Sequence, residues 1–261
     1  MSHTPMSPNM QPMTNSGLLI PMGVYPELSS VNKFGTNLDT GTAFSTVWAY
    51  EGTWTQLAAP TLLEIASEST DDTLAGVGAQ KIVIQGLDEN YLEVEEEVEL
   101  AGQTPVPTTI VYRYVNRMFV SQVGATATQT NIGSIAIADD AETWTLGVPD
   151  TQTLVQGSIA AGLGQTQQAL YTIPAGKTAF LQSGYITADS SKVVSFRFFT
   201  RTDGGPKRIA FEGTVSGGPF QQPFWPYPSF PEKTTMFCEA KVSATTAQVS
   251  AGFDLILLDS R

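Results

Sequence analysis

Few residues in this chain have the types and spacing that catalysis requires. The single histidine, His3, lies in a stretch rich in proline and methionine, where no fixed geometry is expected. The single cysteine, Cys238, lies in an expected strand with no histidine nearby to activate it, so it should be a buried, inert thiol. The sequence therefore argues against Ser-His-Asp, Cys-His and histidine-based metal sites.

Carboxylates are the other candidates for chemistry. Glutamates recur at every second position from Glu93 to Glu99, about 7 Å apart on one face of a strand, a spacing that an acid and base pair would tolerate. Nothing apolar flanks them to tune one as an acid, so a solvated strand face is favoured. The acidic loop clusters, Asp71 with Asp72, Asp88 to Asn90, and Asp139 with Asp140, lack the spaced calcium-loop pattern. The sequence predicts no enzyme, no metal site and no cofactor.

An aromatic and proline-rich loop spans residues 217–233 and is the one segment that suggests binding. Its prolines stiffen the backbone, and its aromatic side chains are Phe220, Phe224, Trp225, Tyr227 and Phe230. Two interpretations stay open. The rings could stack on a sugar, or the loop could pack on its own sandwich or on a neighbouring subunit, which is favoured because rigid aromatic segments lose little entropy on burial.

The segment Gln80–Leu100 predicts a β-hairpin. Apolar residues alternate with polar ones on both sides of a turn at residues 86–90, which contains the Gly, Asp and Asn typical of turns. Glu96 breaks the alternation because it falls on the apolar side. An unpaired carboxylate there would be costly, so we expect a bulge, a sheet edge or a partner at Glu96, and a contact with another subunit at that edge is the sharpest interpretation.

Composition limits the classes of partner. The 261 residues carry a net charge of −12, which argues against nucleic acid because phosphates need a basic surface. Residues 1–160 hold 4 Lys or Arg against 18 Asp or Glu, whereas residues 161–261 hold 9 against 7, which suggests two modules with different neighbours. No apolar run is long enough to span a membrane, and no signal peptide is expected at the start of the sequence.

The expected fold class is all-β, with two antiparallel modules. Residues 1–30 should form an extended arm, 31–140 an N-terminal β module, 141–164 a connection, and 165–261 a jelly-roll-like sandwich. In the last module, residues 234–243 and 248–258 are expected to form a hairpin whose final strand points Val249, Ala251, Phe253, Leu255 and Leu257 inward. Met6, Met10 and Met13 of the arm could dock in a neighbour's groove.

Four segments resemble a family of virion structural proteins of tailed, mainly aquatic bacteriophages. They are NKFGTNLDTGTAF at 32–44, GAQKIVIQGLDENYLEVEEEVEL at 78–100, YTIPAGKTAFL at 171–181, and FPEKTTMFCEAKVSATTAQVSAGFDLILLD at 230–259. The resemblance covers most of residues 31–260. It supplies no catalytic residues to transfer, because these motifs are structural.

The resemblance implies a non-enzymatic virion protein, assembled in the host cytoplasm. The favoured role is a capsid decoration or cement protein that forms a homo-oligomer, with a trimer as one option, and binds the major capsid protein or other virion proteins. A tail or head-to-tail component, such as an adaptor or fibre base, is the structural alternative. A host-glycan-binding module, with carbohydrate as the partner, is the alternative from another class. A polysaccharide depolymerase ranks last because the long β-helix repeats of such enzymes are absent.

Overall fold

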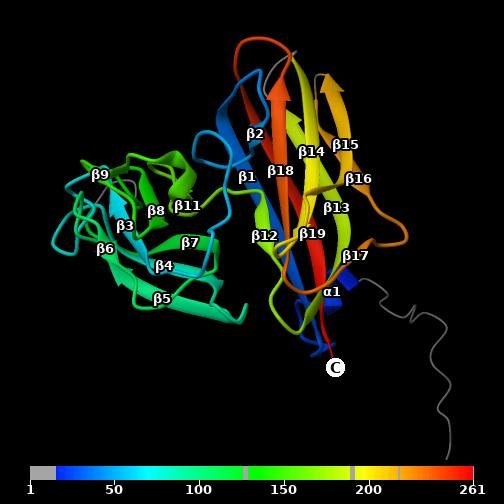
Figure 1. Cartoon of the computed structure of the whole chain (residues 1–261), viewed down its shortest axis with the longest axis horizontal. Coiled ribbons are helices and arrows are strands. Elements are labelled where there is room, and N and C mark those ends of the chain that lie inside the picture. Colours follow the sequence, from blue (N-terminus) through cyan, green and yellow to red (C-terminus); the bar gives the residue numbers. More distant parts are fainter. Residues whose placement is uncertain (1–15, 126–128, 189–191, 217, 261) are drawn as a thin grey trace, which may run out of the picture.

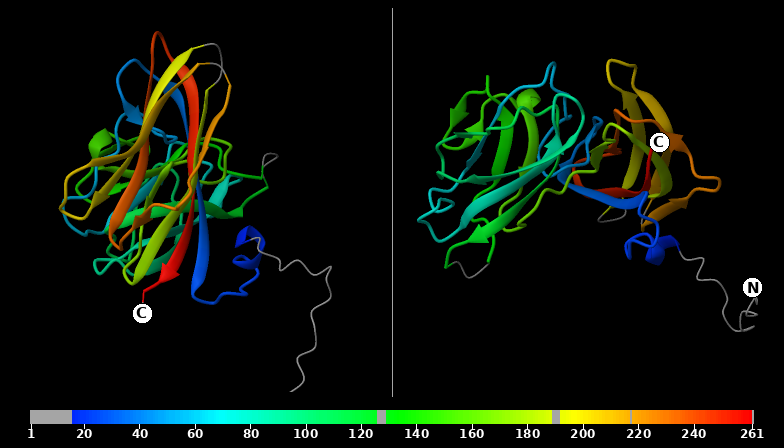
Figure 2. Two further views of the ribbon diagram at one scale, coloured as in Figure 1. Left: turned by 90° about the vertical axis from the view of Figure 1, so that its right-hand side faces the viewer. Right: turned by 90° about the horizontal axis from the view of Figure 1, so that it is seen from below.

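The structure is a computed structural model that describes residues 16–125, 129–188, 192–216 and 218–260. Its regular structure is almost entirely antiparallel β-sheet, in two lobes that lie side by side (Figures 1 and 2). The described helices are short: α1 spans Ser16–Leu19 and a 3-10 helix spans Gln152–Leu154. No described helix has the length and apolar character needed to cross a membrane. The predicted all-β fold class is confirmed.

The larger lobe is a jelly roll made of two sheets. One sheet has the order β1-β19-β13-β16, with β17 also paired to β13, and the other has the order β12-β18-β14-β15, with β2 also paired to β18. If β2 and β12 are counted as two pieces of one strand, the orders are first-eighth-third-sixth and second-seventh-fourth-fifth, as in a jelly roll. The strands are β1 (Leu28–Thr40), β2 (Ser45–Thr46), β12 (Leu170–Thr172), β13 (Lys177–Ala188), β14 (Val193–Thr202), β15 (Arg208–Ser216), β16 (Phe220–Pro223), β17 (Ser229–Phe230), β18 (Thr234–Val242) and β19 (Ala247–Asp259).

Alternating side chains form the jelly-roll core. The five inward residues predicted for the last strand, from Val249 to Leu257, are all buried in β19. Phe198 of β14 packs on Phe253 of β19, with ring centroids 6.1 Å apart, which joins the two sheets. Cys238 is buried in this core as expected, and burial raises the pKa of its thiol well above the usual value. β18 and β19 lie in opposite sheets, so the predicted hairpin is wrong.

The smaller lobe is inserted into the second strand of the jelly roll. β2 pairs with Glu239 and Ala240 of β18, and β12 pairs with the residues just before them. Between these two pieces, Trp48 bridges to Gln168, and the backbones of Val47 and Ala169 both bond to Cys238. Residues 49–167 therefore leave the sheet and return to it at one point, so the interrupted strand keeps its pairing.

The inserted module consists of two main sheets around its own core. Their orders are β11-β8-β3-β6 and β5-β4-β7, and β9 and β10 form a separate ribbon. The core includes Ile65, Ile82, Ile84, Met118 and Ile137, which come from both sheets. The strands are β3 (Leu63–Ser67), β4 (Ala79–Leu87), β5 (Glu93–Glu99), β6 (Val106–Pro107), β7 (Tyr114–Val123), β8 (Ile135–Asp139), β9 (Trp144–Thr145), β10 (Val148–Pro149) and β11 (Val155–Ile159).

An aromatic cluster joins the two modules. Trp54 of the inserted module packs on Phe237 of β18, with ring centroids 6.1 Å apart. At the edge of this cluster, the guanidinium of Arg113 donates to the carboxylate of Asp203 at 2.7 Å. Apolar packing and a partly buried ion pair together fix how the modules sit.

The predicted module boundaries differ from the observed ones. Residues 28–48 belong to the jelly roll, because β1 pairs along its whole length with β19 and β2 pairs with β18. The expected connection at 141–164 contains β11, a paired strand of the inserted module. The pairings of β1 and β2 join segments about 200 residues apart, and local alternation cannot report them.

The predicted hairpin is confirmed as β4 and β5, which pair antiparallel, and Glu93, Glu95, Glu97 and Glu99 are exposed. Glu96 is half-buried on β5, which is the edge strand of its sheet. Its carboxylate accepts hydrogen bonds from the Thr109 amide at 2.7 Å and hydroxyl at 2.9 Å. Of the three options for Glu96, the edge and a partner within the chain are therefore both observed.

Candidate functional site

The structure describes some of the predicted site residues and not others. Met6, Met10 and Met13 lie outside the described residues. Glu96 is satisfied by Thr109 and the Ile110 amide, so its position no longer requires a second subunit. Among the described residues, no group of acidic, histidine or cysteine side chains could hold a metal ion.

The aromatic loop mostly packs on its own jelly roll. Phe220, Phe224 and Phe230 are half-buried against the jelly-roll core, and Phe224 meets Phe211 with centroids 5.1 Å apart. Trp225 is the exception because 88% of its surface is exposed. Tyr227 stands edge-on to it at 5.6 Å. The loop therefore presents one indole ring to solvent rather than a broad aromatic platform.

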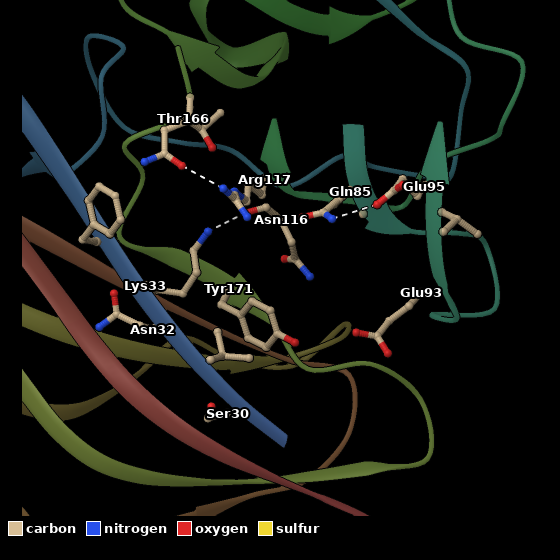
Figure 3. Close-up of a pocket in the computed structure, with 15 residues that line it drawn as sticks. Ser30, Asn32, Lys33, Gln85, Glu93, Glu95, Asn116, Arg117, Thr166 and Tyr171 are labelled. Atoms are coloured by element: carbon tan, nitrogen blue, oxygen red, sulfur yellow. Dashed lines mark hydrogen bonds between the residues drawn. The ribbon is translucent and has the colours of Figure 1, made fainter. Parts of the chain in front are cut away.

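A cleft of about 600 Å³ lies between the two modules. β1 and Tyr171 of β12 form its jelly-roll side, and β4, β5, β7 and residues 165–166 form the opposite side (Figure 3). Its volume is within the usual range for pockets that bind small molecules. The polar side chains that line it are Ser30, Asn32, Lys33, Gln85, Glu93, Glu95, Asn116, Arg117, Gln165, Thr166 and Tyr171.

Lys33 is the most unusual of these residues. Only 9% of it is exposed, and its ammonium donates to the backbone carbonyl of Asn116 on β7. Among the described residues, no carboxylate forms an ion pair with it. Burial, with a smaller contribution from the positive charge of Arg117, lowers the pKa of Lys33 to about 7.

The position of Lys33 follows from strand geometry. β1 is an extended strand, so Val31, Lys33 and Gly35 point to one side. Gly35 passes directly against the backbones of Val47 and Ala169, where the inserted module begins and ends. The Lys33 side chain is therefore directed to the place where β7 approaches the jelly roll.

Asn116 joins β7 to β12 beside Lys33. Its side-chain amide donates to the Thr172 carbonyl at 3.1 Å, and its amide oxygen accepts from the Thr172 N–H at 2.9 Å. Beside it, Arg117 donates to the Gln165 side chain at 2.9 Å and lies over the Phe119 ring. Lys33 and Arg117 therefore both have hydrogen-bond partners that fix their positions.

The end of the cleft at β5 is acidic. Glu95 accepts from Gln85 at 2.8 Å, and Glu93 lies 3.7 Å from the ammonium of Lys177. Tyr171 extends toward Glu93 in Figure 3. Burial, with a contribution from Glu93, raises the pKa of the Tyr171 hydroxyl above its usual value. The cleft therefore offers cations at the end where β1 meets β7 and hydrogen-bond acceptors at the end formed by β5.

Sequence reasoning missed this cleft. Lys33 was not singled out because a lone lysine in a strand usually faces solvent. The available signal was its place two residues after Val31, on the same side of the strand. The other residues of the cleft come from distant segments of the chain, so the pattern around Lys33 could not identify them.

The difference in charge between the two parts of the chain is clearer when it is counted over the observed modules. The inserted segment 49–167 carries 3 Lys or Arg against 16 Asp or Glu, whereas segments 28–48 and 168–260 together carry 9 against 8. Nearly all of the net negative charge therefore belongs to the inserted module. Its field repels polyanions and favours solubility.

Comparisons with known proteins give little. No protein-family model matches the chain, and no curated protein sequence matches it. Solved structures with some similarity include one of the infectious bursal disease virus Gt strain, at 12% identity and a TM-score of 0.23, which covers 89% of this chain and 73% of that one. Another is the PBSX exported protein XepA, at 10% identity and a TM-score of 0.19, which covers 87% of this chain and 84% of that one. At these TM-scores the similarity identifies neither a family nor a function.

Proposed function

We propose that this protein is a non-enzymatic structural component of a tailed-bacteriophage virion, and specifically a capsid decoration or cement protein. It forms a homo-oligomer and binds the major capsid protein. The observation that carries the proposal is the jelly roll with an acidic module inserted in its second strand. Jelly rolls recur in viral capsid proteins, and the resemblance of four segments to phage virion proteins points the same way.

In this proposal the two modules have different tasks. The jelly roll, with nearly balanced charge, contacts the particle through Trp225 and through the arm that contains Met6, Met10 and Met13. An exposed tryptophan on a rigid loop is the kind of residue that anchors a protein interface. The inserted module, with its excess of carboxylates, faces solvent.

The test is incorporation into particles. A decoration protein should be present in hundreds of copies per particle, whereas a tail or head-to-tail component would be present in tens or fewer. Deletion of residues 2–15, or the substitution Trp225→Ala, should leave a folded protein that no longer joins particles. Leu146→Ala is the matched control because Leu146 is 70% exposed but lies on the inserted module. Absence of the wild-type chain from purified particles would refute the proposal.

A host-glycan-binding module is the second candidate, and the exposure of Trp225 favours it. A tryptophan ring can stack on the apolar face of a sugar. Binding on a glycan array that is lost in Trp225→Ala would support this function. Retention of binding in that variant would exclude the loop as the glycan site.

A further inference from the structure

The cleft between the modules has no task in the proposed function, yet its polar groups are arranged for a ligand. Lys33 has three donors and one observed acceptor, the Asn116 carbonyl, although it is more than nine-tenths buried. A buried ammonium with incomplete hydrogen bonding is costly, and an anion in the cleft would supply the missing acceptors. Lys33 is one of the residues that line the cleft (Figure 3).

The acidic end of the cleft, at β5, limits the kind of anion. Glu93 and Glu95 line the same cleft and belong to a strongly acidic module. They would repel a phosphate chain or a nucleic acid. Carboxylates do, however, accept hydrogen bonds from hydroxyl groups, so a ligand with one negative charge and several hydroxyls satisfies both the cationic and the acidic end of the cleft.

The remaining lining groups are also suited to hydroxyls. Asn32, Gln85, Gln165 and Thr166 are neutral donors and acceptors. An apolar ligand would leave these groups and Lys33 without partners, which is unfavourable. The volume of about 600 Å³ is sufficient for at least one sugar ring.

We propose that the cleft binds an acidic saccharide, a hexuronic acid or an oligosaccharide that contains one. Its carboxylate pairs with Lys33 and Arg117, and its hydroxyls donate to Glu93 and Glu95. This site is separate from Trp225, and the inference stands or falls independently of the virion proposal.

The experiment is calorimetric titration of the full-length chain at pH 6.5 with four probes: glucuronate, galacturonate, glucose and acetate. At least one uronate should bind, and it should bind at least about tenfold more tightly than glucose or acetate, because only it engages both the cationic and the acidic end of the cleft. Binding of neither uronate refutes the proposal. Acetate binding as tightly as the uronates shows a simple anion site and refutes the saccharide assignment.

Variants locate the site. Lys33→Met keeps the aliphatic stem and removes the charge, and it should weaken uronate binding by at least about tenfold. Arg117→Gln should also weaken it and should leave folding undisturbed because Arg117 is exposed. Lys81→Met is the matched control, since Lys81 pairs with Glu97 and Glu99 away from the cleft. Unchanged binding in Lys33→Met and Arg117→Gln, with thermal unfolding as the folding check, would place the saccharide elsewhere.

Discussion

The substitution Lys33→Met should stabilise this protein in a manner that depends on pH. In the folded state the pKa of Lys33 is about 7, whereas the usual value is 10.5. Below pH 7 the lysine is charged in both states, so the folded state bears the full cost of a buried ammonium. Between pH 7 and 10.5 the unfolded chain binds more protons than the folded one, so the wild-type unfolding free energy rises with pH.

The size of the effect follows from that interval. A gap of about 3.5 pH units corresponds to about 5 kcal/mol at about 1.4 kcal/mol per unit. Between pH 6 and 9, a range that is easier to measure, wild type should gain about 3 kcal/mol relative to Lys33→Met. The variant should therefore be the more stable protein at pH 6, and its advantage should shrink as pH rises.

The assay is urea unfolding of both proteins at pH 6 and pH 9. The other charged or titratable groups lining the cleft are Arg117 on β7, Glu93 and Glu95 on β5, and Tyr171 on β12. Both proteins retain them, so to first order their contributions cancel in the difference. Lys81→Met is the control because hydrogen bonds to Glu97 and Glu99 raise the pKa of Lys81, so this variant should show no change in advantage over this range. Parallel pH profiles for wild type and Lys33→Met would refute the reasoning.

Three further substitutions test the framework. Asp72→Ala should lower the unfolding free energy by about 3–5 kcal/mol in urea melts. The buried carboxylate accepts hydrogen bonds from the Ala79 amide at 2.7 Å and the Gly133 amide at 2.8 Å, and both would be lost. A loss below about 1 kcal/mol would contradict this. Gly35→Ala should lower the unfolding free energy by about 1–3 kcal/mol or more in the same assay. The added methyl group would meet backbone atoms of Val47 and Ala169, where the insertion begins and ends. An unchanged unfolding free energy would contradict that packing. Partial burial acts to raise the pKa of Asp203, but hydrogen bonds, chiefly from Arg113, lower it below the usual value. Asp203→Asn should therefore cost about 1 kcal/mol at pH 7, and this loss should disappear as pH falls below about 4; a loss independent of pH would exclude the ion pair as its cause.

Local patterns in the sequence predicted single strands and one hairpin well. The alternation from Gln80 to Leu100 gives β4 and β5 because one face of each strand is wet and the other is buried. The inward residues of β19 were identified for the same reason. Alternation of polar and apolar residues shows which face of a strand is buried, and this pattern is clearest in long strands.

The same patterns could not predict which strands pair. β2 and β12 have two and three residues, too short for any periodicity, yet together they form the second strand of the jelly roll. β18 and β19 follow each other closely and alternate well, so a hairpin was expected, although they lie in opposite sheets. Pairing across the chain is set by the packing of two complete sheets, which no short segment encodes alone.

The insertion point links the fold to the cleft. Since the inserted module leaves and returns at Trp48 and Gln168, its position relative to β1 depends on the contacts beyond that stem. One set is the aromatic cluster with the Arg113–Asp203 pair, and the other is the bonding of Asn116 to Thr172 beside Lys33. The first set is mostly apolar and stabilises the arrangement, whereas the second places an incompletely satisfied cation at the junction. An anion bound there would add contacts to both modules, and it would therefore stabilise their observed arrangement against unfolding.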